Sequence, residues 1–384
     1  MCTQLEFSSF THIGKRDYQE DVLSSKQILD RFYVFVVCDG HGGSKECASF
    51  VSRKLIRELE KELSKVFESN KSQRTRYTAL LKRCVMDVAR EWDVLTFGEA
   101  ILSVQTEHQR EIFFKTQVSK NTPRPPASCH GFTMQDRCSG TTVTAMLIDT
   151  GCIPVKIAAA YLGDSRFALK KDLGNSCFVS KDHVPLSKNF TPTENFPSTH
   201  IQNRRLNGIL SMTHAIGDNT PELYGVVKRE PSTFFCTAKN RAFICLGTDG
   251  FWEVFRDPHE TLSYIENGGQ AQRLGEMGIS KFVDNASFFC VRLLPATRHR
   301  RMSSRSQNQS AFRNSTTRPL LQYPPFFSTA RFEQTALLNQ SKKQKETSTK
   351  DSEKLASVRS GQVSSVFHPP PSHSCNVPAR NGTG

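Results

Sequence analysis

The most constraining feature of this chain is a glycine-rich turn that carries an aspartate and a histidine. The apolar run 32–37 (FYVFVV) predicts a buried strand, and the hexapeptide 38–43 (CDGHGG) follows it directly. Asp39 and His41 therefore stand two positions apart at a strand end. Hard divalent cations favour oxygen ligands on such a support, where a backbone carbonyl is also within reach. Taken alone, Asp39-Gly40 is also typical of a hairpin turn, so a metal site needs further acidic residues.

Further acidic residues occupy comparable positions. Glu20 and Asp21 lie upstream of the first apolar run, Asp249 ends a second run and Asp284 precedes a third. Carboxylates that folding brings together raise one another's pKa, and a divalent cation removes the repulsion. Two cations suit a cluster of this size, and paired metals can hold both the attacking and the leaving oxygen of a phosphoryl transfer. Each motif alone fits a turn or a solvated surface pair, so the prediction rests on their joint occurrence.

The order of these motifs resembles that of one protein family, the type 2C protein phosphatases, which are metal-dependent serine/threonine phosphatases. The matching segments are Gly14–Asp21, Cys38–Gly43, Ser139–Thr142, Gly163–Arg166, Asp182-His183, Arg205–Gly208, Gly217-Asp218, Gly247–Trp252 and Asp284-Asn285. The resemblance implies hydrolysis of phosphoserine and phosphothreonine in phosphoprotein substrates. It also implies an α+β fold, a four-layer αββα sandwich of two antiparallel sheets flanked by helices, with the metals at one end between the sheets.

The resemblance further implies a two-metal site that holds Mg²⁺ or Mn²⁺. Asp39 would bridge the two ions, Asp249 and Asp284 would complete the first site, and Glu20 with the backbone carbonyl of Gly40 would serve the second. The expected nucleophile is a hydroxide that both ions bind, so no phospho-enzyme is expected.

Four more residues receive roles from the same resemblance. Asp21 would hold a metal-bound water, and Arg16 would grip the substrate phosphate with two parallel hydrogen bonds. His41 corresponds to the proposed general acid of the family, which protonates the departing oxygen. Asp164 corresponds to an aspartate that can bind a weaker third ion, although a hairpin turn between paired strands is the alternative. Glu253 stands where relatives usually carry aspartate, which leaves that third site open.

Two departures from the family pattern motivate a second hypothesis. His214 stands where relatives carry arginine, and the stretch 184–205 lacks the usual acidic, Arg-Ile and Gly-Gly pattern. Both changes affect the substrate side rather than the metal ligands. They leave a pseudophosphatase as an alternative function, a binding scaffold that keeps the fold without turnover.

Composition divides the chain near residue 295. The segment 296–384 contains 14 Lys and Arg against 4 Asp and Glu, so it carries +10 of the net charge of +14. It is rich in polar residues and proline without sustained periodicity, which predicts a disordered tail behind a catalytic domain at 1–295. Basic clusters at 298–301 and 342–345 fit a nuclear address, a nucleic-acid contact or solvated disorder. The nearly neutral front part argues against direct nucleic-acid recognition.

The remaining sequence features concern location and secondary structure. No apolar stretch approaches the roughly 20 residues of a membrane span, and the N-terminus is no secretory signal. The 12 cysteines show no Cys-x-x-Cys pair, so we expect reduced thiols, as in a protein of the cytoplasm, the nucleus or both. We also expect the protein to be a monomer. Apolar spacings of three and four predict amphipathic helices at 44–67 and about 75–92. Antiparallel strands are predicted at 32–38, 142–148, 155–162, 167–170, 242–248 and 286–293.

Overall fold

The computed structural model describes residues 3–66, 73–119, 132–171, 176–186, 193–239 and 241–295. The chain divides into two units, residues 1–301 and 302–384, and all described residues belong to the first. The tail 296–384 lies outside the described residues. The disorder, the nuclear address and the nucleic-acid contact predicted for it therefore stay predictions, as does the boundary at residue 295.

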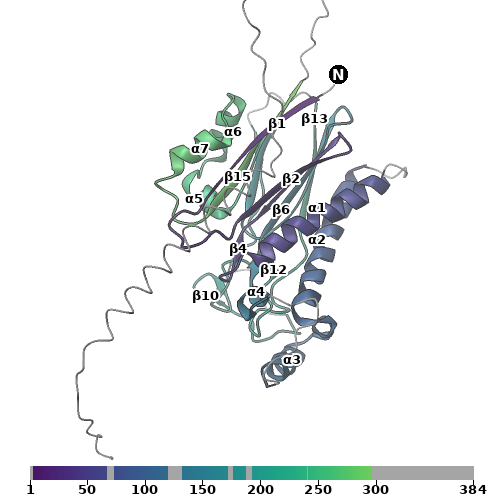
Figure 1. Ribbon diagram of the computed structural model, residues 1–384, viewed down its shortest axis with the longest axis vertical. Helices are drawn as coiled ribbons and strands as arrows, with labels where there is room; N and C mark the ends of the chain where they lie inside the picture. Colours follow the sequence, from purple (N-terminus) through teal and green to yellow (C-terminus); the bar gives the residue numbers. More distant parts are fainter. Residues whose placement is uncertain are drawn as a thin grey trace, which may run out of the picture. The chain divides into compact units, whose positions relative to one another are not determined.

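Two five-stranded sheets form the centre of the first unit (Figure 1). The first sheet has the order β13 (Ser232–Ala238), β7 (Val155–Leu162), β6 (Val143–Asp149), β3 (Phe32–Cys38) and β2 (Val22–Ile28). The second has the order β1 (Thr3–His12), β15 (Ala286–Pro295), β14 (Ala242–Gly247), β8 (Arg166–Lys171) and β9 (Cys177–Val179). Neighbouring strands in both sheets pair antiparallel, which confirms the prediction.

Strand β3 shows why the run 32–37 is apolar throughout. Successive side chains of a strand point to opposite faces of its sheet. Val34 and Val36 belong to the core between the first sheet and two helices, whereas Phe35 and Val37 belong to the core between the two sheets. Because both faces of β3 are covered, neither alternate set of side chains is polar.

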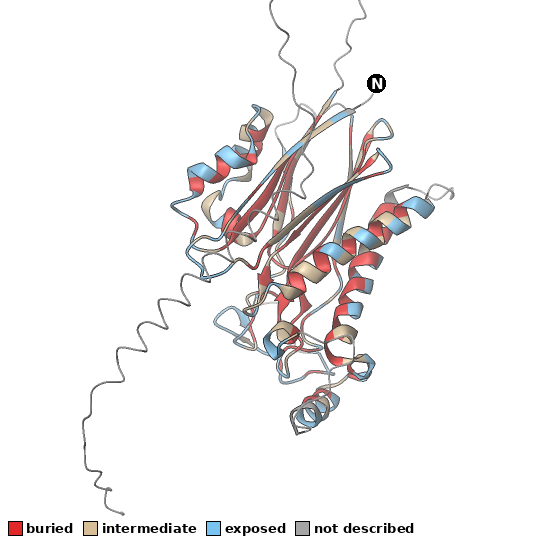
Figure 2. Cartoon of the chain, in the orientation of Figure 1, coloured by how far each residue is buried: buried red, intermediate tan, exposed pale blue. Residues whose placement is uncertain are grey.

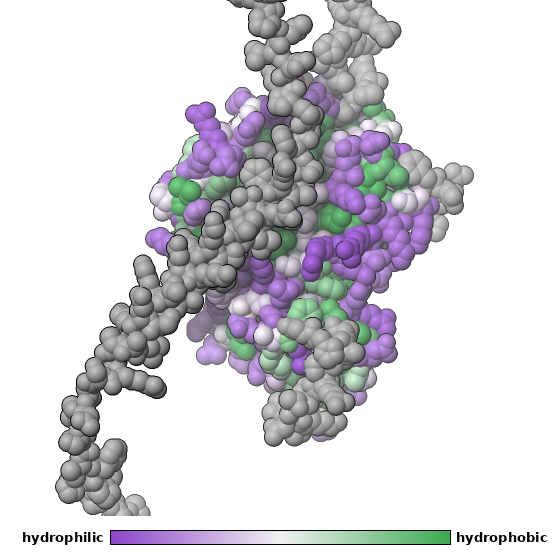
Figure 3. Space-filling view, viewed as in Figure 1, coloured by the Kyte–Doolittle hydropathy of each residue, from purple (hydrophilic) through white to green (hydrophobic). Residues whose placement is uncertain are grey.

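Two long helices, α1 (Glu46–Val66) and α2 (Gln73–Phe97), cover the outer face of the first sheet. Their predicted apolar faces are buried, which confirms the periodicity argument (Figure 2). The buried side chains are Ala48, Val51, Leu55, Leu59, Leu63, Tyr77, Leu80, Leu81, Cys84, Val85, Val88 and Trp92. Burial of each leucine contributes about 1.5–3 kcal/mol. On the face drawn in Figure 3, hydrophilic side chains cover most of the described surface.

Three shorter helices cover the outer face of the second sheet. They are α5 (Asp249–Val254), α6 (Pro258–Glu266) and α7 (Ala271–Gly278). Trp252, Leu262 and Leu274 pack from these helices against Phe243 and Phe288 of the sheet. The layers are therefore helices, sheet, sheet and helices, which confirms the four-layer αββα sandwich.

The other described elements lie around one end of the sheets. They are η1 (Glu99–Ser103), α3 (Glu107–Ser119), α4 (Met134–Cys138) and the pair β10 (Ile201–Gln202) and β11 (Arg205–Leu206). A small third sheet has the order β12 (Ile216–Gly217), β5 (Gly140–Thr141) and β4 (Gly40–His41). Among the helices described, none is long and apolar enough to cross a bilayer.

The topology also corrects one alternative. Asp164 follows β7 and precedes β8, and these two strands lie in different sheets. The segment 163–165 therefore carries the chain from one sheet to the other, and the hairpin between paired strands that Gly163-Asp164 suggested is wrong. Crossing between the sheets places Asp164 at their shared end.

Candidate metal centre

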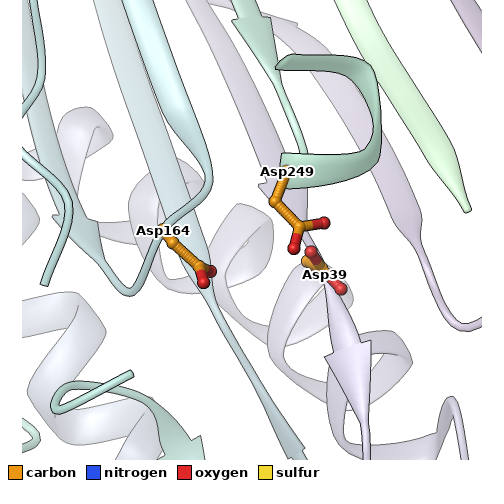
Figure 4. Close-up of side chains that lie close together, drawn as sticks. All are labelled: Asp39, Asp164 and Asp249. Carbon is orange, nitrogen blue, oxygen red and sulfur yellow. The ribbon is translucent and has the colours of Figure 1, made fainter. Parts of the chain in front are cut away.

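Three aspartates from distant parts of the chain converge at this end of the sandwich. Asp39 follows β3, Asp164 lies in the crossover between the sheets, and Asp249 is the first residue of α5. One carboxylate oxygen from each lies within 4.8 Å of the others (Figure 4). Asp164 is buried, and Asp39 and Asp249 are half-buried. Asp39 and Asp249 were predicted ligands of the first ion, whereas Asp164 was predicted only for a weaker third.

The surroundings of these carboxylates oppose their negative charge. Burial raises the pKa of Asp39 well above its usual range, and the neighbouring Asp249, Asp21 and Asp164 add to the rise. Burial and the charge of Asp249 raise the pKa of Asp164 to about 7. Burial likewise raises the pKa of Asp249. A divalent cation between the three groups would remove this penalty.

The donor set fits such a cation. All three groups supply carboxylate oxygens, the ligands that Mg²⁺ and Mn²⁺ favour. One buried oxygen of Asp164 has no hydrogen-bond partner among the described residues, and neither has one of Asp21. Buried polar atoms normally have partners, so two free acceptors beside an acidic cluster indicate a ligand that the chain itself does not supply.

The backbone around Asp39 is held by the Ser139–Thr142 motif. The Asp39 amide donates to Thr142 Oγ1 at 3.1 Å, and Thr141 Oγ1 donates to the Asp39 carbonyl at 3.0 Å. Thr142 Oγ1 also lies 2.7 Å from Ser165 Oγ, next to Asp164. Through these hydrogen bonds the two threonines connect the backbone at Asp39 to the segment that carries Asp164.

Glu20 and Gly40 lie against one another. A Cβ atom on Gly40 would sit 2.6 Å from the Glu20 carbonyl oxygen, so only glycine permits this approach. The Glu20 carboxylate accepts a hydrogen bond from the Gly43 amide at 2.9 Å, and burial raises the pKa of Glu20. Neither residue belongs to the tight group of three oxygens. Their service to the second ion stays a prediction.

Asp21 and Asp284 lie at the border of the cluster. Asp21 is buried and accepts a hydrogen bond from Thr248 Oγ1 at 3.0 Å. Burial raises the pKa of Asp21 to about 7, with further contributions from Asp249 and Asp284. Asp284 forms an ion pair with Arg16 at 2.5 Å. The metal roles of both aspartates also stay predictions.

Arg16 stands where it can reach both the cluster and solvent. Its guanidinium pairs with Asp284 and also lies within electrostatic range of Glu20 and Asp249. The side chain is 55% exposed, so it can turn toward a phosphate that approaches from outside. The predicted grip of Arg16 on the substrate phosphate stays a prediction.

His41 is held by a residue for which the sequence supplied no role. Its Nε2 atom lies 2.8 Å from Oδ1 of Asp218, and its Nδ1 atom is buried without a partner among the described residues. Burial opposes protonation of the ring, but the charge and hydrogen bond of Asp218 outweigh it, so the pKa of His41 is raised. Gly217-Asp218 was recognised only as a motif, and its position in the ordered series was the one available signal.

Two positions bear on the departures from the family pattern. Burial and the nearby Asp249 raise the pKa of Glu253, so this carboxylate also lies in the field of the cluster. His214 stacks on His183 with ring centroids 4.1 Å apart. Burial and His183 lower the pKa of His214 to about 4, so it is neutral at physiological pH.

Comparisons with known proteins agree on one family. A sequence model described as "Protein phosphatase 2C" matches residues 5–266. The integrin-linked kinase-associated serine/threonine phosphatase 2C of Homo sapiens is 26% identical over 262 residues, which cover 66% of this chain and 55% of that protein. The probable protein phosphatase 2C 6 of Paramecium tetraurelia is 26% identical, covering 67% of this chain and 77% of that protein.

A solved structure supports the fold as well. The serine-threonine phosphatase 2C from Toxoplasma gondii matches with a TM-score of 0.50 and 17% identity, covering 75% of this chain and 95% of that chain. At this identity the likeness shows the fold alone. The chain spans about half the length of the human protein that it matches.

Proposed function

Because this chain belongs to the protein phosphatase 2C family, we propose that it is a metal-dependent phosphatase that hydrolyses phosphoserine and phosphothreonine in proteins. The observation that carries this proposal is the convergence of Asp39, Asp164 and Asp249 within 4.8 Å. Three carboxylates whose pKa values are all raised form a centre that gains most from cations.

In this proposal Asp39, Asp164 and Asp249 hold the ions together with Glu20, Asp284 and the Gly40 carbonyl, while Asp21 binds through water. Divalent ions held by these residues would supply Lewis-acid chemistry that makes hydroxide available near neutral pH. Mg²⁺ and Mn²⁺ are the ions that the family implies, and the proposed number is two. Asp164 would also take part in a third site if Glu253 supplies a further ligand there.

The protein's own cations act on the phosphate and on the leaving group. Arg16 turns from Asp284 to the phosphate, where its planar guanidinium can donate two parallel hydrogen bonds. Asp218 raises the pKa of His41, which favours the protonated ring, and in this proposal His41 gives a proton to the ester oxygen as the P–O bond breaks. No side chain needs to become phosphorylated.

The test uses the full chain with p-nitrophenyl phosphate and a phosphothreonine peptide. We expect hydrolysis of both with Mn²⁺ or Mg²⁺ and loss of activity in EDTA that added Mn²⁺ restores. A second readout is thermal unfolding, because an ion at 100 times its Kd stabilises the folded state by about 2.7 kcal/mol. Chelator-insensitive hydrolysis, or no hydrolysis with any ion, would contradict the proposal.

One observation favours the second hypothesis, a pseudophosphatase scaffold. His214 is uncharged at physiological pH, so it cannot supply the positive charge of the arginine that relatives carry there. The acidic cluster argues for the enzyme, because a scaffold has no need for three crowded carboxylates. Calorimetric titration with Mn²⁺ separates the two: binding that is lost in Asp39→Ala supports the enzyme, and no binding favours the scaffold.

A further inference from the structure

The small sheet beside the metal centre brings together three motifs that are remote in the sequence. In this sheet β5 lies between β4 and β12, and Gly140 is the cross-strand partner of both His41 and Gly217. Asp218 directly follows Gly217. The pairing register therefore places the imidazole of His41 and the carboxylate of Asp218 on either side of a residue without a side chain.

Gly140 provides the space in which the two side chains meet. A Cβ atom on Gly140 would lie 2.4 Å from His41 Nε2 and 2.6 Å from Oδ1 of Asp218. Real Cβ atoms do not approach other atoms so closely, so any larger residue would push the pair apart. The 2.8 Å contact between Nε2 and Oδ1 thus depends on glycine at this position.

Asp218 is itself fixed from several directions. It is buried, its φ of 56° lies in the left-handed region, and its amide donates to the Ser139 carbonyl at 3.2 Å. The Arg229 guanidinium donates to the Gly217 carbonyl and to Asn219 Oδ1, one residue on each side. A left-handed aspartate clamped on both flanks has little freedom to leave His41.

We propose that Asp218 is a positioning residue that fixes the orientation of the His41 ring by accepting a hydrogen bond from its Nε2–H group. This inference rests on the proposed function, in which His41 protonates the leaving group. A carboxylate can only accept a hydrogen bond, so its partner nitrogen must carry the hydrogen. Asparagine at position 218 would keep the shape of the side chain, but its amide can both donate and accept, so it would no longer require the hydrogen to be on His41 Nε2.

The step that depends on this geometry is cleavage of the ester bond. A water oxygen forms a bond to phosphorus and loses a proton to solvent, and the P–O ester bond breaks with its electron pair on the ester oxygen. That oxygen takes the Nδ1 proton of the His41 imidazolium, while the Nε2–H group stays hydrogen-bonded to Asp218, which leaves a neutral imidazole and a free threonine or serine hydroxyl. Proton donation matters most for an alkoxide, which is a poor leaving group, and least for p-nitrophenolate.

The kinetic test compares Asp218→Asn with the wild-type chain on these two kinds of leaving group. We expect kcat for a phosphothreonine peptide to fall about 10²-fold, kcat for p-nitrophenyl phosphate to fall less than about 10-fold, and KM to change little. Asp218→Asn should add nothing in a chain that already carries His41→Ala, because the two residues act as one unit. Equal losses on both substrates, or no loss, would overturn the proposal.

Asp93→Asn is the matched control. Asp93 is also buried and lies 3.7 Å from the same Arg229 guanidinium, but it does not contact His41. If the effect of Asp218→Asn came only from disturbing this polar cluster, Asp93→Asn would cause the same selective loss. We expect it to leave the ratio of the two activities unchanged.

A second measurement does not need an active enzyme. Spectra of the full chain with ¹⁵N-labelled histidine should show a slowly exchanging Nε2–H signal for His41, identified by its absence in His41→Gln. The signal should be lost in Asp218→Asn and kept in Asp93→Asn, with or without Mn²⁺. An unchanged His41 signal in Asp218→Asn would overturn the proposal. An inactive wild-type chain that shows the expected signals would instead contradict only the proposed function.

Discussion

Asp149 and Asp39 stand at opposite ends of the same pair of strands, and their surroundings shift their pKa values in opposite directions. Asp149 ends β6, whereas Asp39 follows β3, which runs antiparallel to β6 with Phe32 opposite Asp149. Asp149 is buried and accepts hydrogen bonds from Arg31 at 2.5 and 2.8 Å and from Tyr77 at 2.6 Å.

The pKa values of the two ends follow from these partners. Burial opposes the charge of Asp149, but the hydrogen bonds from Arg31 and Tyr77 outweigh it, and the pKa of Asp149 is lowered. At the other end, burial and three neighbouring aspartates raise the pKa of Asp39. Arg31 supplies a positive charge to the structural carboxylate of Asp149. No side-chain cation among the described residues forms an ion pair with the clustered carboxylates of Asp39, Asp164 and Asp249. This difference separates a stabilising ion pair from a site for an external cation.

The largest expected effect is on phosphatase activity and comes from neutralising an aspartate of the metal centre. Asp249→Asn removes a ligand charge, so we expect phosphatase activity with Mn²⁺ to fall by about 10³-fold or more, equivalent to several kcal/mol of transition-state stabilisation. The chain should stay folded, because the substitution relieves repulsion in the cluster. Activity on the phosphothreonine peptide and the circular dichroism spectrum measure the two outcomes. Activity near the wild-type level would show that Asp249 is no ligand.

Neutralising Asp149, at the other end of the strands, should lower stability and leave activity unchanged. Asp149→Asn leaves Arg31 without its charged partner and Tyr77 with a weaker acceptor, which should cost about 3 kcal/mol of unfolding free energy. Urea unfolding measures this loss. Activity per folded molecule should be unchanged because Asp149 lies at the far end of the strands. A stable variant with reduced activity would break the comparison.

The smallest effect is a difference in pH dependence for the chelated protein. The pKa of Asp164 in the folded chain, about 7, lies above its ordinary value of 3.8, so the stability that its protonated form contributes is lost as pH rises toward and through 7. Asp164→Asn should therefore raise the melting temperature in EDTA at pH 8 by a few degrees, about 1 kcal/mol, and change it little at pH 4.

Asp149 should show the opposite sign. Its folded pKa is lowered, so its contribution is fully present above pH 3.8 and is lost only as pH falls through that lower value. The gap between the wild type and Asp149→Asn should accordingly persist from pH 5 to pH 8. If both variants shifted the melting temperature in the same direction at pH 8, the proposed contrast would be wrong.

Much of the fold was predictable because burial imposes strong periodicity. The apolar faces of α1 and α2 follow helical spacing, and the run 32–37 becomes β3 with the predicted bounds. The four edge strands of the two large sheets, β1, β2, β9 and β13, were missed. Strand β2 has three exposed residues in succession, so it lacks a clear alternating pattern. The two-residue strands of the small sheet are too short for any periodicity to appear.

The site was predictable in its members more than in its arrangement. Asp39 and Asp249 were recognised because each ends an apolar strand. Asp164 was ranked behind Glu20 and Asp284, yet it is Asp164 that completes the tight group of three. The local sequence Gly163-Asp164 fits a hairpin equally well, and only the crossover between the sheets distinguishes the two. Asp218 was missed as the partner of His41 because 177 residues separate them.

The sequence by itself determined which segments are apolar strands and helices and which acidic residues stand at their ends, since these properties depend on local chemistry and spacing. The tertiary structure decided which of those residues meet. The exit of β7 into the second sheet brings Asp164 to Asp39, and the small sheet brings Asp218 to His41 across Gly140. The physical reason is that strand register and sheet order depend on packing between distant segments, which local composition does not encode.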